Sequence, residues 1–242
     1  MSALLAVKAV SKRFRGLLAV DSVSFAVPAG AIFAVIGPNG AGKTTLFNMI
    51  AGAMAPDDGS IIFAGARIGG LPADAVCRRG VARTFQIVRP FPALSVEDNV
   101  VIGALRHRRQ VGAAREQARA LLQRLELFDK RHRIASTLTL PDRKRLEVAR
   151  ALATDPQLLL LDEVMAGLRP TETDRMVAIL HALNRETGLT ILLIEHVMRA
   201  VMALASRILV LHHGAAIAEG LPEQVVREPA VIDSYLGVEA IT

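Results

Sequence analysis

The chain has 242 residues, of which 52% are hydrophobic, 21% charged and 4% aromatic. A chain of this length buries roughly 72% of its unfolded surface on folding, and the composition excludes a disordered chain, a collagen-like repeat and a coiled coil. The net charge of +6 rests on 29 basic residues, mostly arginines, and it favours a polyanionic partner such as a nucleotide, a nucleic acid or an anionic lipid.

No apolar run is long enough to cross a membrane. The longest runs, such as 31–36 and 158–161, are far shorter than the ~18 to 20 residues of a membrane-spanning helix. The basic residues near the start do not form a signal-peptide pattern, so we expect a cytoplasmic protein. The single cysteine, Cys77, has no second thiol to pair with and is expected to be a reduced residue in or near the core.

Strand and helix patterns alternate along the first part of the chain. The apolar run 31–36 predicts a buried strand, and the glycine-rich stretch after it predicts a loop. The apolar pattern from Thr44 to Ile50 then predicts a helix that stops at Gly52.

The strand pattern disappears between Pro90 and Pro156. Ser95 is expected to cap one helix, and an apolar stripe predicts another, formed by Ala114, Ala118, Leu121, Leu122 and Leu125. A further helix is expected to start around Thr171, followed by a buried strand at 190–194. These patterns predict an α/β fold with a mostly parallel core sheet that a helical insert interrupts.

The strongest chemical pattern lies at 37–44, where the sequence matches G-x-x-x-x-G-K-[ST] between a predicted strand and a predicted helix. Glycines let successive N–H groups point at phosphate oxygens, Lys43 neutralises the β and γ oxygens, and the Thr44 hydroxyl ligates Mg²⁺. The alternative is a glycine turn without chemistry. The residues expected to bind the nucleotide here are Gly37, Asn39, Gly40, Gly42, Lys43, Thr44 and Thr45.

A phosphate loop needs a carboxylate that holds the metal, and Asp162 follows the apolar run 158–161. We expect Asp162 to bind Mg²⁺ and its neighbour Glu163 to polarise the water that attacks the γ-phosphate. The alternative is that the two acids cap the helix that follows. Their place at the end of a strand favours the first interpretation, because open α/β sheets bind ligands there.

Nearly the whole chain resembles the ATP-binding subunits of ABC transporters, in particular those that energise branched-chain amino-acid uptake. The resemblance rests on the phosphate loop, the Asp162-Glu163 strand and six further segments. These segments are Ser11–Val20, Arg83-Thr-Phe-Gln86 with Val88–Phe91, Arg145–Arg150, Ile191–His196, Ala218–Pro222 and Tyr235-Leu-Gly237.

The resemblance implies a P-loop NTPase of the ABC ATPase type, with an N-terminal antiparallel β subdomain. It implies a single domain with its core at about 1–90 and 157–220, a helical subdomain at about 91–156 and a C-terminal extension at about 221–242. It implies that Phe14 stacks on adenine, that Gln86 contacts Mg²⁺ and the attacking water, and that His196 contacts the γ-phosphate.

The same resemblance implies partners. Two ATPase subunits close head to tail over ATP and Mg²⁺ at the cytoplasmic face of the membrane, beside integral permease subunits that receive solute from a binding protein. Each ATP then faces a Leu-Ser-Gly-Gly-Gln-like signature on the other subunit. The matching stretch here is Leu138-Thr-Leu-Pro-Asp142, where Leu140 and Pro141 replace small residues and Pro141 has no N–H to donate. We therefore expect a heterodimer.

Three alternative functions stay open at this point. The same motor could serve another small solute, such as urea or an organic acid. The chain could be an ATPase that acts on nucleic acid, or a pseudo-ATPase that senses nucleotide without turnover. The basic cluster 106–109 has no neighbouring aromatic residues for base stacking, so we interpret it as a solvated helix end and expect no nucleic-acid partner.

Overall fold

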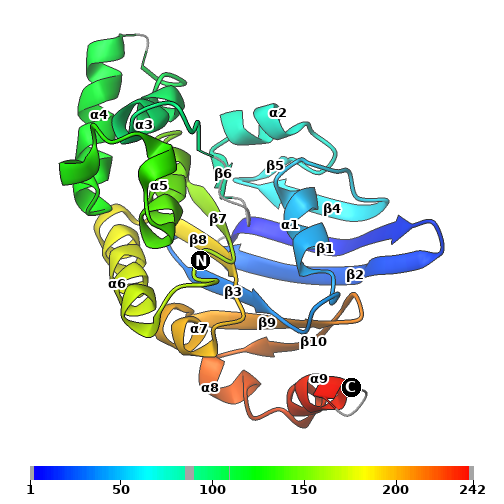
Figure 1. The fold of residues 1–242 in the computed structure, drawn as a ribbon. Helices are drawn as coiled ribbons and strands as arrows, with labels where there is room; N and C mark the ends of the chain where they lie inside the picture. The colour runs from blue at the N-terminus through cyan, green and yellow to red at the C-terminus, as the bar shows by residue number, and fades with distance from the viewer. Residues whose placement is uncertain (1–2, 85–89, 109, 240–242) are drawn as a thin grey trace.

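The computed structural model describes residues 3–84, 90–108 and 110–239, with side chains as far as Tyr235. Its strands form two sheets (Figure 1). The antiparallel sheet has the order β2-β1-β4-β5 and consists of β1 (Ala3–Phe14), β2 (Leu17–Pro28), β4 (Asp58–Phe63) and β5 (Ala66–Arg67). It confirms the predicted N-terminal antiparallel sheet.

The second sheet has six strands in the order β10-β9-β3-β8-β7-β6. They are β3 (Ile32–Ile36), β6 (Val81–Arg83), β7 (Leu158–Asp162), β8 (Thr190–Ile194), β9 (Arg207–His212) and β10 (Ala215–Gly220). All neighbours are parallel except β9 and β10. This order confirms the mostly parallel core sheet, and it places the carboxyl ends of β3, β7 and β8 at one edge.

The helices cover this sheet and surround its edge. They are α1 (Lys43–Ile50), α2 (Ala73–Arg78), α3 (Val96–Ala104), α4 (Val111–Arg124), α5 (Leu140–Leu152), α6 (Pro170–Thr187), α7 (Met198–Leu204), α8 (Pro222–Val225) and α9 (Pro229–Glu239), with 3₁₀ turns at Phe128–Lys130 and Ala135–Thr137. None of the helices in the described part of the chain has the length and apolar character that a bilayer span requires.

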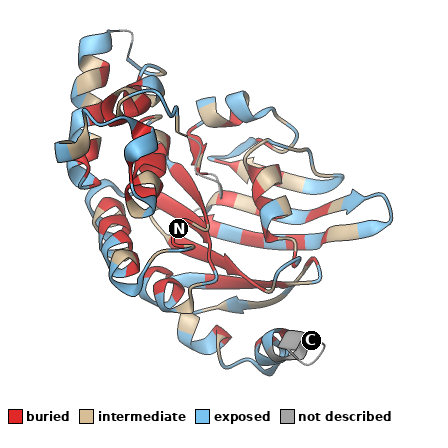
Figure 2. Ribbon diagram, in the orientation of Figure 1, coloured by how far each residue is buried: buried red, intermediate tan, exposed pale blue. Residues whose placement is uncertain are grey.

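Alternate side chains of the central strand β3 join two separate cores. Figure 2 shows that the strands of the parallel sheet are mostly buried. Ile32, Ala34 and Ile36 pack on the side of the helices, whereas Phe33 and Val35 pack towards the antiparallel sheet and α1. Successive side chains of a strand point to opposite faces, so a strand that is covered on both faces reads as a continuous apolar run. The phosphate loop therefore begins from a strand that is fixed on both sides.

The described residues between 90 and 156 form helices and no strand. The Ser95 hydroxyl accepts a hydrogen bond from the Asp98 N–H (3.0 Å), which confirms the predicted cap. Ala114, Ala118 and Leu122 on α4 are fully buried, as the apolar stripe predicts. Helices α3, α4 and α5 pack on one another beyond the edge strand β6 (Figure 1).

Two local expectations need adjustment. Helix α6 begins at Pro170 with Arg169 at its cap, so Thr171 lies inside the first turn; the Glu172 carboxylate accepts a hydrogen bond from the Arg169 N–H at 2.8 Å. The basic cluster after α3 was predicted to be a solvated helix end, but the side chains of Arg106 and His107 both form hydrogen bonds with the Thr154 carbonyl (3.2 and 2.9 Å). Arg109 lies outside the described residues.

Candidate functional site

The loop between β3 and α1 fits closely between the two sheets. Gly37, Gly40 and Gly42 have φ angles of 148°, 79° and 97°, a region that L side chains rarely adopt. A Cβ at Gly37 would lie 2.1 Å from the Leu211 carbonyl oxygen of β9, and a Cβ at Gly42 would lie 2.3 Å from the Ala19 carbonyl oxygen of β2. Glycine is therefore required at these two positions both for conformation and for space.

The Lys43 side chain stabilises the loop by hydrogen bonds to the loop's own backbone. Its Nζ donates hydrogen bonds to the carbonyls of Gly37 (2.6 Å) and Pro38 (2.9 Å). Burial lowers the pKa of Lys43, and the charges of Glu163 and Asp162 oppose that shift. Because carbonyl groups are weaker partners for an ammonium group than phosphate oxygens, this amine can transfer to an anion that enters the loop.

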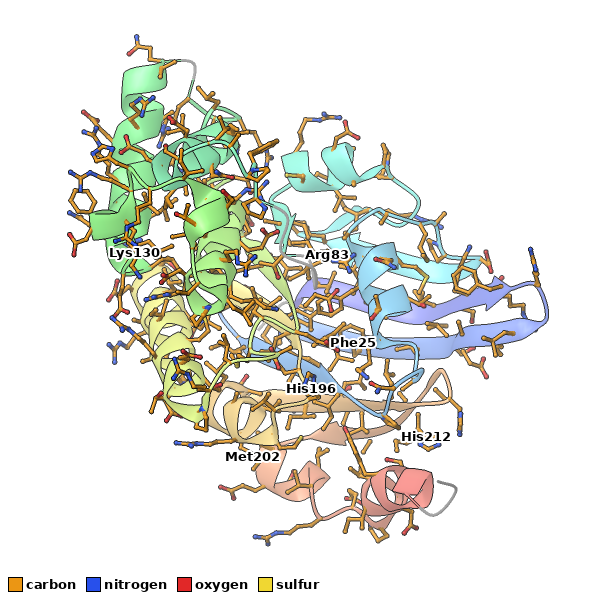
Figure 3. All side chains as sticks on the ribbon, viewed as in Figure 1. Phe25, Arg83, Lys130, His196, Met202 and His212 are labelled. Carbon is orange, nitrogen blue, oxygen red and sulfur yellow. The ribbon has the colours of Figure 1, made fainter. Side chains whose placement is uncertain are left out.

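Asp162 lies at the carboxyl end of β7 with only 1% of its surface exposed. Its Oδ2 accepts a hydrogen bond from Arg83 (2.7 Å), which comes from the end of β6 (Figure 3), and its N–H donates to the Thr84 hydroxyl (3.1 Å). Its Oδ1 is buried and finds no hydrogen-bond partner among the described residues. A buried carboxylate oxygen needs a partner, so this atom is suited to a cation or to water.

Glu163 has a φ of +50°, a left-handed conformation that is uncommon outside glycine. Contacts of its backbone hold it there: the N–H donates to the Ile194 carbonyl of β8 (3.0 Å), and the carbonyl accepts from Lys144 Nζ of α5 (2.9 Å). Its carboxylate lies 3.9 Å from His196 Nδ1, and His196 follows the end of β8 (Figure 3). Strained residues of this kind cluster at functional sites.

Glu195 lies directly after β8, at the same carboxyl edge of the parallel sheet, and sequence reasoning assigned it no role. It is 1% exposed, and its carboxylate accepts a hydrogen bond from the Met165 N–H (2.8 Å). Burial raises the pKa of Glu195, while that hydrogen bond and the charge of His196 act in the opposite direction. An acid directly before His196 at the end of an apolar strand was the available signal.

An open cleft of about 440 Å³ adjoins the loop. It is lined by Phe14, Leu17, Leu18, Ala19, residues 39–45, Glu163 and His213. The structure thus brings Phe14, the loop and Glu163 to one cleft. Asp162 precedes Glu163 at the end of β7, and His196 Nδ1 lies 3.9 Å from the Glu163 carboxylate. Gln86 lies outside the described residues. Sequence reasoning placed Phe14 of the β1–β2 hairpin in the site but gave no role to Leu17–Ala19 of the same hairpin or to His213 of the β9–β10 turn, because no chemical motif marks them.

These residues fit a nucleotide with Mg²⁺. Among the described residues there is no cluster of three or more side chains of the His, Cys, Asp and Glu types that could hold a metal alone. Mg²⁺ sites in proteins commonly use one or two side-chain oxygens and complete the set with phosphate oxygens and water. The free Oδ1 of Asp162 and the Thr44 hydroxyl at the start of α1 match that requirement.

The stretch 138–142 runs from the end of the 3₁₀ turn at Ala135–Thr137 into α5, with Thr139 as the N-cap and Pro141 in the first turn of the helix. The Thr139 hydroxyl donates a hydrogen bond to Asp142 Oδ2 (2.9 Å). The Asp142 carboxylate also accepts hydrogen bonds from the side chains of Lys130 (2.5 Å) and Arg145 (2.6 Å). Burial alone would raise the pKa of Asp142, but these hydrogen bonds together hold it below its usual value. The hydroxyl and the charges at this helix end are therefore already engaged within the chain.

Two family models match the chain. The model described as "ABC transporter" matches residues 20–166, and the model described as "Branched-chain amino acid ATP-binding cassette transporter" matches residues 217–241. Among curated proteins, the branched-chain amino acid transport ATP-binding protein BraF of Pseudomonas aeruginosa is 41% identical over 97% of this chain and 98% of its own length. LivG of Escherichia coli is 40% identical with the same coverage.

Solved structures agree with this likeness. A nucleotide-free ATP-binding cassette from an ABC transporter superimposes with a TM-score of 0.89 at 29% identity, over 97% of this chain and 99% of that chain. The ADP conformation of the cassette MJ1267 gives the same TM-score and identity, over 98% and 100% of the two chains.

The buried pair of Arg83 and Asp162 gives a testable prediction. Arg83→Met should lower the free energy of unfolding by about 3–5 kcal/mol, because it leaves the carboxylate buried without its cation. The matched control is Arg207→Met, whose partner Glu219 is half-exposed and whose loss should cost about 1 kcal/mol or less. Urea unfolding monitored by circular dichroism measures both, and equal losses would contradict the assigned role of the buried pair.

Proposed function

The chain belongs to the ABC transporter ATP-binding family, and on that premise we propose that it is the ATP-hydrolysing subunit of a membrane importer for branched-chain amino acids. The observation that carries the proposal is the match of residues 217–241 to the branched-chain amino acid cassette model, in a chain whose glycine-rich loop lines one cleft with Glu163. The near-full-length likeness to BraF and LivG supports the same solute class.

We propose the following roles at the nucleotide. Phe14, which is 43% exposed at the edge of the cleft, offers its ring to adenine. The N–H groups of the loop and the start of α1 bind the phosphates, through Gly37, Asn39, Gly40, Gly42, Lys43, Thr44 and Thr45. Lys43 Nζ leaves the carbonyls of Gly37 and Pro38 and neutralises the β and γ oxygens.

Hydrolysis uses the carboxyl edge of the sheet. We assign Asp162 and Thr44, together with Gln86, to the Mg²⁺ site; when bound, the ion neutralises charge on the phosphates. Glu163 accepts a proton from the attacking water, and the fixed backbone of Glu163 aims its carboxylate into the cleft. His196, 3.9 Å from Glu163, lies on the same side and contacts the γ-phosphate.

The proposed assembly extends beyond this chain. It comprises a second ATPase subunit, integral permease subunits at whose cytoplasmic face the chain binds, and a solute-binding protein. The proposed division of the chain follows the described layers: a core of both sheets (about 1–90 and 157–220), a helical subdomain (about 91–156) and a C-terminal extension (about 221–242).

The importer role predicts a loss of uptake. Cells that lack this chain should lose uptake of leucine, isoleucine and valine, and the wild-type chain should restore it, whereas Glu163→Gln should not. Uptake of radiolabelled amino acids measures this. Unchanged uptake in the deletion strain, or purified ATPase activity that DNA or RNA stimulates, would refute the proposal.

Binding and hydrolysis should separate in two variants. Lys43→Ala should weaken MgATP binding by about 1.5–3 kcal/mol, the range for a hydrogen bond to a charged group, whereas Glu163→Gln should keep binding and slow hydrolysis roughly 100-fold or more in the assembled complex. Calorimetry and phosphate release measure the two effects. The exposed residues Lys8 and Glu116 provide the controls Lys8→Ala and Glu116→Gln, and equal effects in variants and controls would contradict the roles.

We further propose a heterodimer with one strong and one weak ATP site. Pro141 lacks an N–H, and the Thr139 hydroxyl is bound to Asp142, so the start of α5 offers few donors to a partner's ATP. The loss of one such donor slows turnover on the order of 100- to 1000-fold. The isolated subunit should therefore hydrolyse ATP slowly.

Replacing Leu140 and Pro141 together by glycine should raise the ATPase activity of the isolated subunit, since the change restores an N–H and removes a bulky side chain. Pro222→Gly makes the corresponding change in the first turn of α8 and should leave activity unaltered. Brisk hydrolysis by the purified wild-type homodimer, with no gain in the double variant, would rule out the asymmetric dimer.

A further inference from the structure

Hydrogen bonds from two neighbouring elements fix the backbone around Glu163. The Glu163 N–H donates to the Ile194 carbonyl of β8 (3.0 Å), and the nearby Met165 N–H donates to the Glu195 carboxylate that follows β8 (2.8 Å). The Glu163 carbonyl accepts a hydrogen bond from Lys144 Nζ at 2.9 Å. Lys144 belongs to α5, so the segment after β7 is held by the core sheet on one side and by a helix of the helical layer on the other.

The contact with Lys144 is the stronger of the two that the Glu163 carbonyl makes. The Ala166 N–H also donates to this carbonyl (3.2 Å) and closes a turn within the same segment. A hydrogen bond from an ammonium group is shorter and stronger than one from a neutral amide. The left-handed conformation of Glu163 persists only where the surroundings enforce it, and Lys144 supplies a large part of that constraint.

Lys144 is a buried charge that the proposed chemistry at the nucleotide does not use. It is 4% exposed and is not among the residues that line the cleft. Burial lowers the pKa of Lys144, and the charges of Glu195, Glu163, Asp162 and Glu147 oppose that shift. Burying a charge is costly unless the group is paired and hydrogen-bonded, and here its hydrogen bond goes to the peptide of the residue that we assign as the general base.

We propose that Lys144 is a positioning residue for hydrolysis, whose ammonium group fixes the Glu163 peptide and so directs the Glu163 carboxylate into the cleft. The proposal rests on the proposed hydrolysis of ATP at this site. A general base acts only within hydrogen-bond reach of the proton that it accepts, and the carboxylate moves with the backbone that carries it. Because α5 packs against β7 (Figure 1), the place of this helix sets the geometry of the base.

The test removes the amine and keeps the length of the side chain. In the assembled complex, Lys144→Met should lower kcat roughly 10- to 100-fold, the scale of a displacement of about 1 Å, and leave the Kd for MgATP in calorimetry at the wild-type value. Lys144→Arg keeps a cationic donor and should recover most of the rate. The control Arg119→Met removes a cation from the buried Glu97 in the same helical layer and should change neither quantity.

A double-mutant cycle separates positioning from general stabilisation. In the Glu163→Gln background, Lys144→Met should cause no further loss of kcat, because the carboxylate that it positions is already gone. An equal loss in both backgrounds, or weakened MgATP binding in place of slowed hydrolysis, would overturn the proposal. If Lys144→Met does not fold, Lys144→Gln, with its shorter and uncharged side chain, takes its place in the same cycle with the same expected result.

The failure of this proposal is distinguishable from the failure of the proposed function. If the wild-type complex neither binds nor hydrolyses MgATP, the proposed function is refuted. If the wild-type complex hydrolyses MgATP and Lys144→Met does so at the wild-type rate, the positioning role of Lys144 alone is refuted.

Discussion

The close approach of two carbonyl groups to the phosphate loop is the constraint on which the rest of the site depends. Leu211 of β9 and Ala19 of β2 leave no room for a Cβ at Gly37 and Gly42. These carbonyls come from different sheets, so the loop marks the place where the parallel and antiparallel sheets meet. Its shape is therefore a property of the whole core, and close-packed interiors transmit small displacements.

Buried charges around this loop balance one another at short range. Lys43 and Lys144 are both buried, burial lowers the pKa of each, and the acidic residues of the sheet edge oppose the shift. Arg83 neutralises one oxygen of Asp162 and leaves the other without a partner among the described residues. Unpaired polar groups are costly in such surroundings, which favours the entry of a phosphate and its cation.

The start of α5 shows the opposite arrangement. Asp142 is 2% exposed and is contacted by Lys130, Arg145 and Thr139. Arg145 also binds Glu126, which in turn pairs with Arg175 of α6. Hydrogen bonds and ion pairs within the chain therefore satisfy the charged groups here and connect α5 to α6. Few polar groups at the start of α5 remain available to bind a second molecule. The contrast between the two helix starts is the physical basis for the proposed asymmetric dimer.

Sequence alone determined the features that short-range chemistry controls. The buried strands followed from apolar runs, the start of α3 from the Ser95 cap, and α4 from its stripe, because periodicity and capping act within a few residues. The glycine and lysine spacing fixed the phosphate loop in the same way, and Asp162 and Glu163 followed from their place after a strand. The tertiary structure alone decided which distant segments complete the site. Only the tertiary arrangement brings Arg83 to Asp162, and brings Ala19 of β2 and His213 of the β9–β10 turn to the loop. Contacts between residues far apart in the chain depend on how the strands pair across the sheets and carry no local pattern.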